Sequence, residues 1–213
     1  MKNKEKVIIL GTAHLRTTPG KCSPDKRLRE YAYSREIVSM LESELKHRGH
    51  TVYVDYRATD PNAQMKSASA RVEQSKELAY RVGIVNKICK EYGAKNCVYV
   101  SVHVNAAGGG GKWHDARGFS VFVSPNASAN SRLLAQLFLK EAISMRLTGN
   151  RYIPSRGYWE SNLYVCRNTL CPAVLTENLF QDNKEDVDFL LSDDGKQAIV
   201  DLHRKAIEDY ISL

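Results

Sequence analysis

Short apolar runs alternate with helix-patterned segments along the whole chain, and this alternation limits the fold more than any other feature of the sequence. Six apolar runs have the length of buried strands: residues 6–11, 51–57, 97–104, 118–124, 163–166 and 171–177. Apolar residues recur at helical spacing in four other segments: 28–48, 64–92, 131–145 and 183–211, the last with a break near 193–195. Alternating strands and helices predict an α/β fold with helices packed on a central sheet. For 213 residues we expect a single domain, 1–213.

The composition narrows the class of protein. The chain is 43% hydrophobic and 26% charged, which is ordinary for a globular domain. No apolar run approaches the length of a membrane span, and the first run, residues 7–10, is too short for the core of a secretory signal. The five cysteines form no C-x-x-C pair, so we expect buried thiols rather than a cysteine-ligated zinc.

The charge of the chain favours an anionic partner. The formal net charge is +7, which suits a nucleic acid, a membrane surface or an acidic cell-wall polymer. The basic residues are scattered, and no helix-turn-helix, zinc-finger or RNP-like motif is present in the sequence. A nucleic acid is therefore the weakest of the three expectations.

Three of the strand-like runs end in a side chain that can do chemistry. VIILGTAH ends at His14, VYVSVHVN carries His103 near its end, and PAVLTE ends at Glu177. Ligands of open α/β sheets bind beyond the carboxyl ends of the strands, so we expect these three residues to converge. Each also has a plain interpretation: a loop histidine, a hydrogen-bonded core histidine and a helix-capping glutamate. Together they favour a site.

Two histidines suggest zinc, which in catalytic sites takes three protein ligands, commonly two histidines and a carboxylate. The helix expected at 28–48 offers Glu30 and Glu36 as the third ligand. Glu30 falls on the same helical face as the apolar stripe, whereas Glu36 falls on the flank beside the charged face. The helical phase therefore selects Glu30, although a carboxylate at this position also suits a helix N-terminus. Glu177 remains as the acid and base that amide hydrolysis requires.

Several stretches together resemble a known family. They are VIILGTAH at 7–14, the helix and strand from 30 to 60, ELAYRVGIVNKIC with Arg81 and Asn86, SVHVNA, and LYVCRNTLCPAVLTEN. In this order and spacing they are similar to the zinc-dependent N-acetylmuramoyl-L-alanine amidases, which cleave peptidoglycan. The resemblance implies a twisted, mixed and mostly parallel sheet of about six strands with helices on both faces.

The resemblance also implies roles for individual residues. His14, Glu30 and His103 match the ligands of one Zn²⁺, and Glu177 matches the catalytic glutamate. The bond cleaved would be the amide between N-acetylmuramic acid and L-alanine. The partner would be peptidoglycan, and we expect a monomer that is made in the cytoplasm and acts on the cell wall after release or export.

The sequence departs from the family around these residues. The family usually has Asp-Pro-Gly before the first histidine and Gly-Gly after it, where this chain has Gly-Thr-Ala and Leu-Arg. The family's glycine after the catalytic glutamate is also absent. These changes alter the surroundings of the site and hence the preferred muropeptide. Candidate substrate contacts in nearby loops, each of which also suits solvated surface, are Arg16, Asn105, Arg117 and Arg156.

Two other functions fit the same residues. A zinc peptidase or amidohydrolase acting on another peptide would use the same four side chains and differ in its product. A zinc-stabilised wall-binding or regulatory module that does not cleave would have no need of Glu177. The complete set of four favours the enzyme.

Overall fold

The computed structural model describes residues 6–109 and 111–213. Their strands form one sheet in the order β2-β1-β3-β6-β4-β5. The strand bounds are Val7–Thr12 for β1, Thr51–Val54 for β2, Cys97–Asn105 for β3, Ser120–Val123 for β4, Trp159–Glu160 for β5 and Ala173–Phe180 for β6. β2, β1, β3 and β6 run parallel, and β4 pairs antiparallel with β6. The expected mixed, mostly parallel sheet is thereby confirmed.

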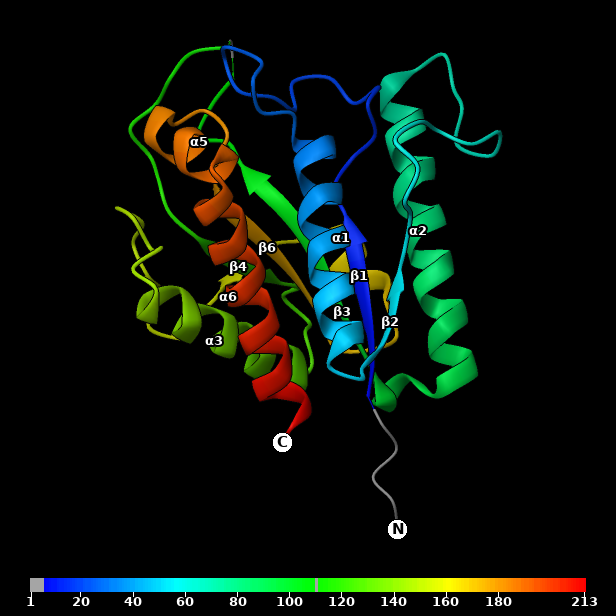
Figure 1. The fold of residues 1–213 in the computed structure, drawn as a ribbon. Coiled ribbons are helices and arrows are strands. Elements are labelled where there is room, and N and C mark those ends of the chain that lie inside the picture. Colours follow the sequence, from blue (N-terminus) through cyan, green and yellow to red (C-terminus); the bar gives the residue numbers. More distant parts are fainter. Residues whose placement is uncertain (1–5, 110) are drawn as a thin grey trace.

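Helices cover both faces of this sheet (Figure 1). One face packs against four of them: α1 at Glu30–His47, α3 at Ala129–Ser144, α5 at Lys184–Leu191 and α6 at Asp193–Ile211. The other face packs against α2 at Ala70–Tyr92 and the short α4 at Tyr164–Asn168. A 3₁₀ turn at Ala94–Asn96 leads into β3. Among the described residues, no helix is long and apolar enough to span a membrane.

The apolar character of β1 follows from its place inside the sheet. Ile8 and Leu10 enter the core beneath α1, while Val7 and Ile9 enter the core beneath α2. A parallel strand covered on both faces needs apolar residues at every position rather than at alternate ones. This is why the run VIIL is continuous.

One expected strand is a helix. Residues 164–166 lie in α4 and Leu163 precedes its first turn, so the strand at the edge of the sheet is β5 instead. Four apolar residues are too few to distinguish strand from helix by periodicity. The backbone hydrogen bond from Arg167 N to the carbonyl of Leu163 at 3.0 Å is helical, and the side chains of Asn168 and Thr169 donate to the carbonyls of Tyr164 and Val165.

The other elements differ from expectation mainly at their ends. The helix expected at 64–92 begins at Ala70, where the Ser69 hydroxyl accepts from the backbone of Val72. The break expected near 193–195 is present, because α5 ends before Ser192 and Ser192 caps α6. In Figure 1, β1 and β3 both point away from the end of the molecule where the C-terminus lies.

Candidate metal centre

His14 stands directly after β1 in a backbone conformation that few side chains adopt. Its φ is 45°, in the left-handed region, which costs roughly 1–2 kcal/mol for a residue other than glycine. Bonds to both sides of it hold the loop: Ala13 N donates to Ser34 Oγ at 2.8 Å, and Arg81 Nη2 donates to the His14 carbonyl at 3.2 Å. A strained residue held by its surroundings is typical of a functional site.

Glu30 is the first residue of α1, and only 1% of it is exposed. Its Oε1 accepts from the backbone of Val104 at 3.2 Å and lies 3.1 Å from His103 Nδ1. Its Oε2 has no hydrogen-bond partner, although His14 Nε2 is 3.4 Å away. Burial alone would raise the pKa of Glu30, but the two histidines outweigh it and hold the pKa below its usual range.

His103 lies on β3, and each of its two ring nitrogens faces a polar side chain. Nε2 is 3.0 Å from the Ser101 hydroxyl, and Nδ1 faces Glu30. Burial lowers the pKa of His103 more than Glu30 raises it, which favours the neutral imidazole that binds metals. The rings of His14 and His103 meet edge to face, with centroids 5.1 Å apart.

His14, Glu30 and His103 form a group that could hold a metal ion. One ligand atom from each lies within 4.8 Å of the others. Two imidazoles and one carboxylate are the donor set of many catalytic zinc sites. The unpartnered Oε2 of Glu30 is the observation that fits a cation best, because a buried carboxylate oxygen without a partner is costly.

Glu177 lies beside this group on β6. It stands opposite His103 on one side and Ser120 of β4 on the other. Its Oε2 is buried and has no hydrogen-bond partner. Burial and the charge of Glu30 raise the pKa of Glu177 well above its usual range, and Lys21 and Arg151 offset this in part. A carboxyl in this setting can take and return a proton.

A profile of the family described as N-acetylmuramoyl-L-alanine amidase matches residues 8–209, nearly the whole chain. The chain belongs to this family.

Individual relatives agree with this membership. The chain is 36% identical over 132 residues to an endolysin of Bacillus phage SPP1, which is 61% of this chain and 46% of the phage protein. It is 28% identical over 135 residues to the N-acetylmuramoyl-L-alanine amidase CwlM of Bacillus licheniformis, which is 63% of this chain and 46% of that protein. The chain thus spans under half the length of these curated relatives.

Solved structures of the family have the same fold. The CwlD amidase from Clostridioides difficile, in complex with the GerS lipoprotein, superposes with a TM-score of 0.80 at 21% identity, covering 98% of this chain and 99% of that one. The catalytic domain of CwlV from Paenibacillus polymyxa var. colistinus gives a TM-score of 0.73 at 20% identity, with 97% and 98% coverage.

The segment after Glu177, where the family's glycine is absent, contains a residue in the left-handed backbone region. Leu179, two residues after Glu177, has a φ of 62°. The pairing of β3 with β6 shifts register here, so that Asn105 stands opposite Phe180. Asn178 Nδ2 donates to the carbonyl of His103 at 2.9 Å, which joins the two strands at the site. The irregularity therefore helps to position Glu177 and His103 together.

The helical phase correctly predicted which of two glutamates on α1, Glu30 and Glu36, is buried. Glu30 is buried, while 47% of the Glu36 side chain is exposed, in an ion pair with Lys196 at 2.7 Å. Asn105 lies two residues after His103 on the same strand, with its Nδ2 3.5 Å from the Ser120 hydroxyl.

The three arginines proposed as substrate contacts already have acidic partners. Arg16 pairs with Asp60, Arg117 with Glu185, and Arg156 with Glu160. Sequence reasoning instead missed Lys21, whose ammonium is 3.8 Å from Glu30 Oε2, and Arg151. Neither stands at a strand end or on a helical stripe, so no pattern distinguishes it from other basic loop residues.

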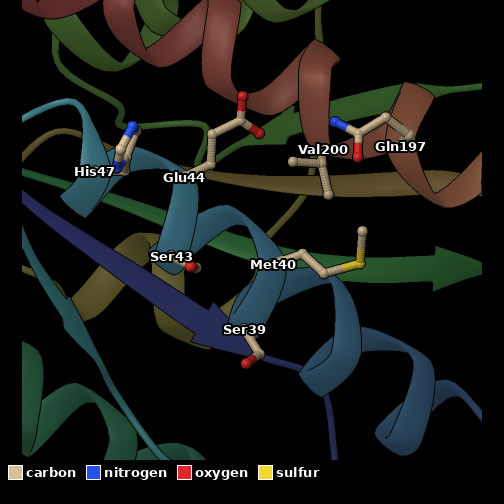
Figure 2. A pocket seen from close by; sticks show the side chains of 7 residues that line it. All are labelled: Ser39, Met40, Ser43, Glu44, His47, Gln197 and Val200. Atoms are coloured by element: carbon tan, nitrogen blue, oxygen red, sulfur yellow. The ribbon is translucent and has the colours of Figure 1, made fainter.

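Figure 2 shows a separate surface groove between α1 and α6, lined by Ser39, Met40, Ser43, Glu44, His47, Gln197 and Val200. Met40 is ten residues beyond Glu30, about 15 Å along the helix. Glu44 is engaged by Arg204 at 3.1 Å. The groove is therefore distinct from the metal centre.

Proposed function

We propose that this chain hydrolyses the amide between N-acetylmuramic acid and L-alanine in peptidoglycan, in a zinc-dependent reaction. The observation that carries the proposal is the convergence of His14, Glu30 and His103 within 4.8 Å, with Glu177 on the neighbouring strand. Membership of the amidase family and similarity to a phage endolysin support the same substrate.

We assign the zinc to His14, Glu30 and His103, whose donor atoms and unpartnered Glu30 oxygen suit a divalent cation. When bound, Zn²⁺ would supply a Lewis acid that polarises the scissile carbonyl and makes water more acidic. Ser101 would keep the His103 ring in its present orientation through Nε2. The backbone of Val104 would do the same for Glu30.

Glu177 would move the proton. Its unpartnered Oε2 would accept a proton from the attacking water and then donate it to the departing nitrogen of alanine. Burial and the charge of Glu30 raise the pKa of Glu177 and so make its protonated form accessible, which the second step needs. One carboxyl would thus act as base and then as acid.

We further propose that residues 1–213 act as one catalytic domain, as a monomer, on the cell wall. The described strands form one sheet with helices on both faces, and the grouping of His14, Glu30 and His103 within this single unit supports the proposal. Size-exclusion chromatography with light scattering would test the monomer, for which we expect a mass near 24.0 kDa.

Mass spectrometry of digested peptidoglycan tests the reaction. Purified sacculi would be incubated with the metal-free protein, with the protein plus Zn²⁺, and with the variants Glu177→Gln and Glu36→Gln plus Zn²⁺. We expect free stem peptides that begin at L-alanine with the wild type and with Glu36→Gln. Glu36→Gln controls for the chemical change from glutamate to glutamine, because Glu36 is exposed and paired with Lys196.

The products separate the competing functions. Cleavage at another amide would still support the metal centre but would show that the substrate is a different peptide. A folded, zinc-loaded protein that binds sacculi and releases nothing would indicate a wall-binding module. Release by Glu177→Gln at the wild-type rate would contradict the role of Glu177.

A further inference from the structure

Arg151 lies in the segment between α3 and β5, clamped by two aromatic rings. Its guanidinium carbon is 5.5 Å from the ring centre of Trp159 and 5.3 Å from that of Phe180. Phe180 is itself only 1% exposed, so one side of the clamp is rigid core. Aromatic stacking of this kind fixes the plane of a guanidinium.

The clamp lies on the same face of the sheet as Glu177. Side chains two apart on a strand share a face, as do residues opposite one another on neighbouring strands. Glu177 therefore shares its face with Leu175, whose partner Phe122 stands opposite Trp159. The register shift after His103 places Phe180 opposite Asn105, which brings its ring to this face too.

Arg151 has no acidic partner among the described residues, unlike the arginines around it. Arg16, Arg117 and Arg156 each pair with a carboxylate. The Nε of Arg151 is buried without a hydrogen-bond partner, and its backbone N–H donates to Thr148. A guanidinium that is held in place, partly buried and unpaired is prepared for an anion from outside the chain.

We infer that Arg151 binds a carboxylate of the stem peptide, on the departing side of the scissile amide. The inference rests on the proposed function, because it takes a muramoyl peptide as the substrate. A carboxylate matches the two parallel N–H donors of a guanidinium held in a fixed plane.

Two synthetic substrates that differ only in their carboxylate charges test the inference. Muramoyl-L-alanyl-D-glutamate carries two free carboxylates, and muramoyl-L-alanyl-D-glutamic diamide carries an amide in place of each. We expect Arg151→Gln to lower kcat/KM for the carboxylate substrate by about 10- to 100-fold, mostly through KM, and to change the amide substrate by less than about threefold. Arg151→Lys should restore part of the loss.

Arg156→Gln is the matched control. Arg156 comes from the same segment and also stacks on an aromatic ring, that of Tyr158, but it is paired with Glu160. We expect it to affect the two substrates equally. Because the ratio of the two substrates is measured within one variant, a partly folded preparation does not alter it. Equal losses on both substrates with Arg151→Gln, or no loss on either, would overturn the inference.

Calorimetry separates this inference from the proposed reaction. The same two compounds would be titrated into zinc-loaded Glu177→Gln protein, with and without Arg151→Gln. We expect the carboxylate compound to lose affinity about 10- to 100-fold when Arg151 is replaced. Arg151-dependent binding without any cleavage by the wild type would overturn the reaction and support the carboxylate contact. A wild type that neither binds nor cleaves either compound would overturn both.

Discussion

Two buried polar clusters lie side by side at the end of β1, and they differ in how their charges are compensated. In the first, Arg81 donates from Nη1 to Asp55 and from Nε to Glu77, both at 2.9 Å. Both oxygens of Asp55 accept hydrogen bonds, one of them from the Tyr99 hydroxyl. We call this the Arg81 cluster. Arg81 forms an ion pair with each of these two carboxylates at 2.9 Å, although Glu77 Oε2 has no hydrogen-bond partner.

The second cluster consists of His14, Glu30, His103 and Glu177. Glu30 and Glu177 each keep a buried oxygen without a hydrogen-bond partner, and the nearest ammonium to Glu30, that of Lys21, is 3.8 Å away. A polar cluster whose carboxylates are paired with a cation of the protein, as in the Arg81 cluster, contributes rigidity. The second cluster lacks such close pairing, so we call it the open cluster, and an arrangement of this kind contributes reactivity. The Arg81 cluster also supports the open one, because Arg81 Nη2 donates to the carbonyl of His14.

The largest expected effect is the loss of activity when Glu177, the proposed proton acceptor and donor of the open cluster, is replaced. Glu177→Gln should lower turnover by about 10²- to 10⁴-fold, because the amide cannot accept the proton from water. The variant should be as stable as the wild type or more so, since it removes a buried, unpaired carboxyl. Release of stem peptides and thermal unfolding would measure the two effects. A clear loss of stability would mean that Glu177 is structural.

Breaking the Arg81 cluster should do the reverse. Arg81→Met leaves Asp55 and Glu77 buried without their cation, so we expect the free energy of unfolding to fall by about 3–5 kcal/mol. Arg71→Met, on an exposed position of the same helix, should change it by less than about 0.5 kcal/mol. Urea denaturation of metal-free protein would measure both. Equal stability of the two variants would refute the contrast between the clusters.

A buried histidine outside both clusters gives a pH dependence of stability. Burial lowers the pKa of His203 to about 4, and its ring nitrogens bond Thr176 and Ile199. Between pH 4 and the ordinary value near 6.5, the unfolded chain binds a proton that the folded chain does not, so acid favours unfolding. The contribution is complete above pH 6.5 and is lost by pH 4.

The expected loss is about 3 kcal/mol across this range. The measurement is the free energy of unfolding of wild type and His203→Gln at several pH values between 4 and 7. The difference between the two proteins should shrink as the pH falls. A difference that stays constant would show that His203 is protonated equally in the folded and unfolded chains.

Zinc bound to the open cluster should compensate its negative charge and stabilise the folded protein. Zinc at 100 times its dissociation constant should stabilise the folded protein by about 2.7 kcal/mol, since the unfolded chain lacks the assembled site. His103→Ala should remove this gain, while His203→Gln should keep it, because His203 is not one of the three ligands. Thermal unfolding with zinc and with a chelator would measure the shift. An equal zinc response in His103→Ala would place the metal elsewhere.

The local pattern of the sequence was sufficient to predict most of the fold and the core of the site. Continuous apolar runs identified the central strands because a doubly covered parallel strand has no polar positions. The ends of those strands predicted that His14, His103 and Glu177 converge, and the helical phase correctly predicted that Glu30 is buried. Each of these inferences depends on periodicity within a single element.

Contacts between distant segments were decided only by the tertiary structure. Residues 164–166 belong to a helix whose turns are closed by Arg167 N and by the side chains of Asn168 and Thr169, which four apolar residues do not reveal. Ion pairs with acidic residues are formed by Arg16, Arg117 and Arg156, whereas Arg151 packs against two aromatic rings. The sequence determined where polar groups meet the sheet edge, because this follows from local backbone geometry. Which charges are compensated depends on residues brought together from far along the chain, and that only the folded structure decides.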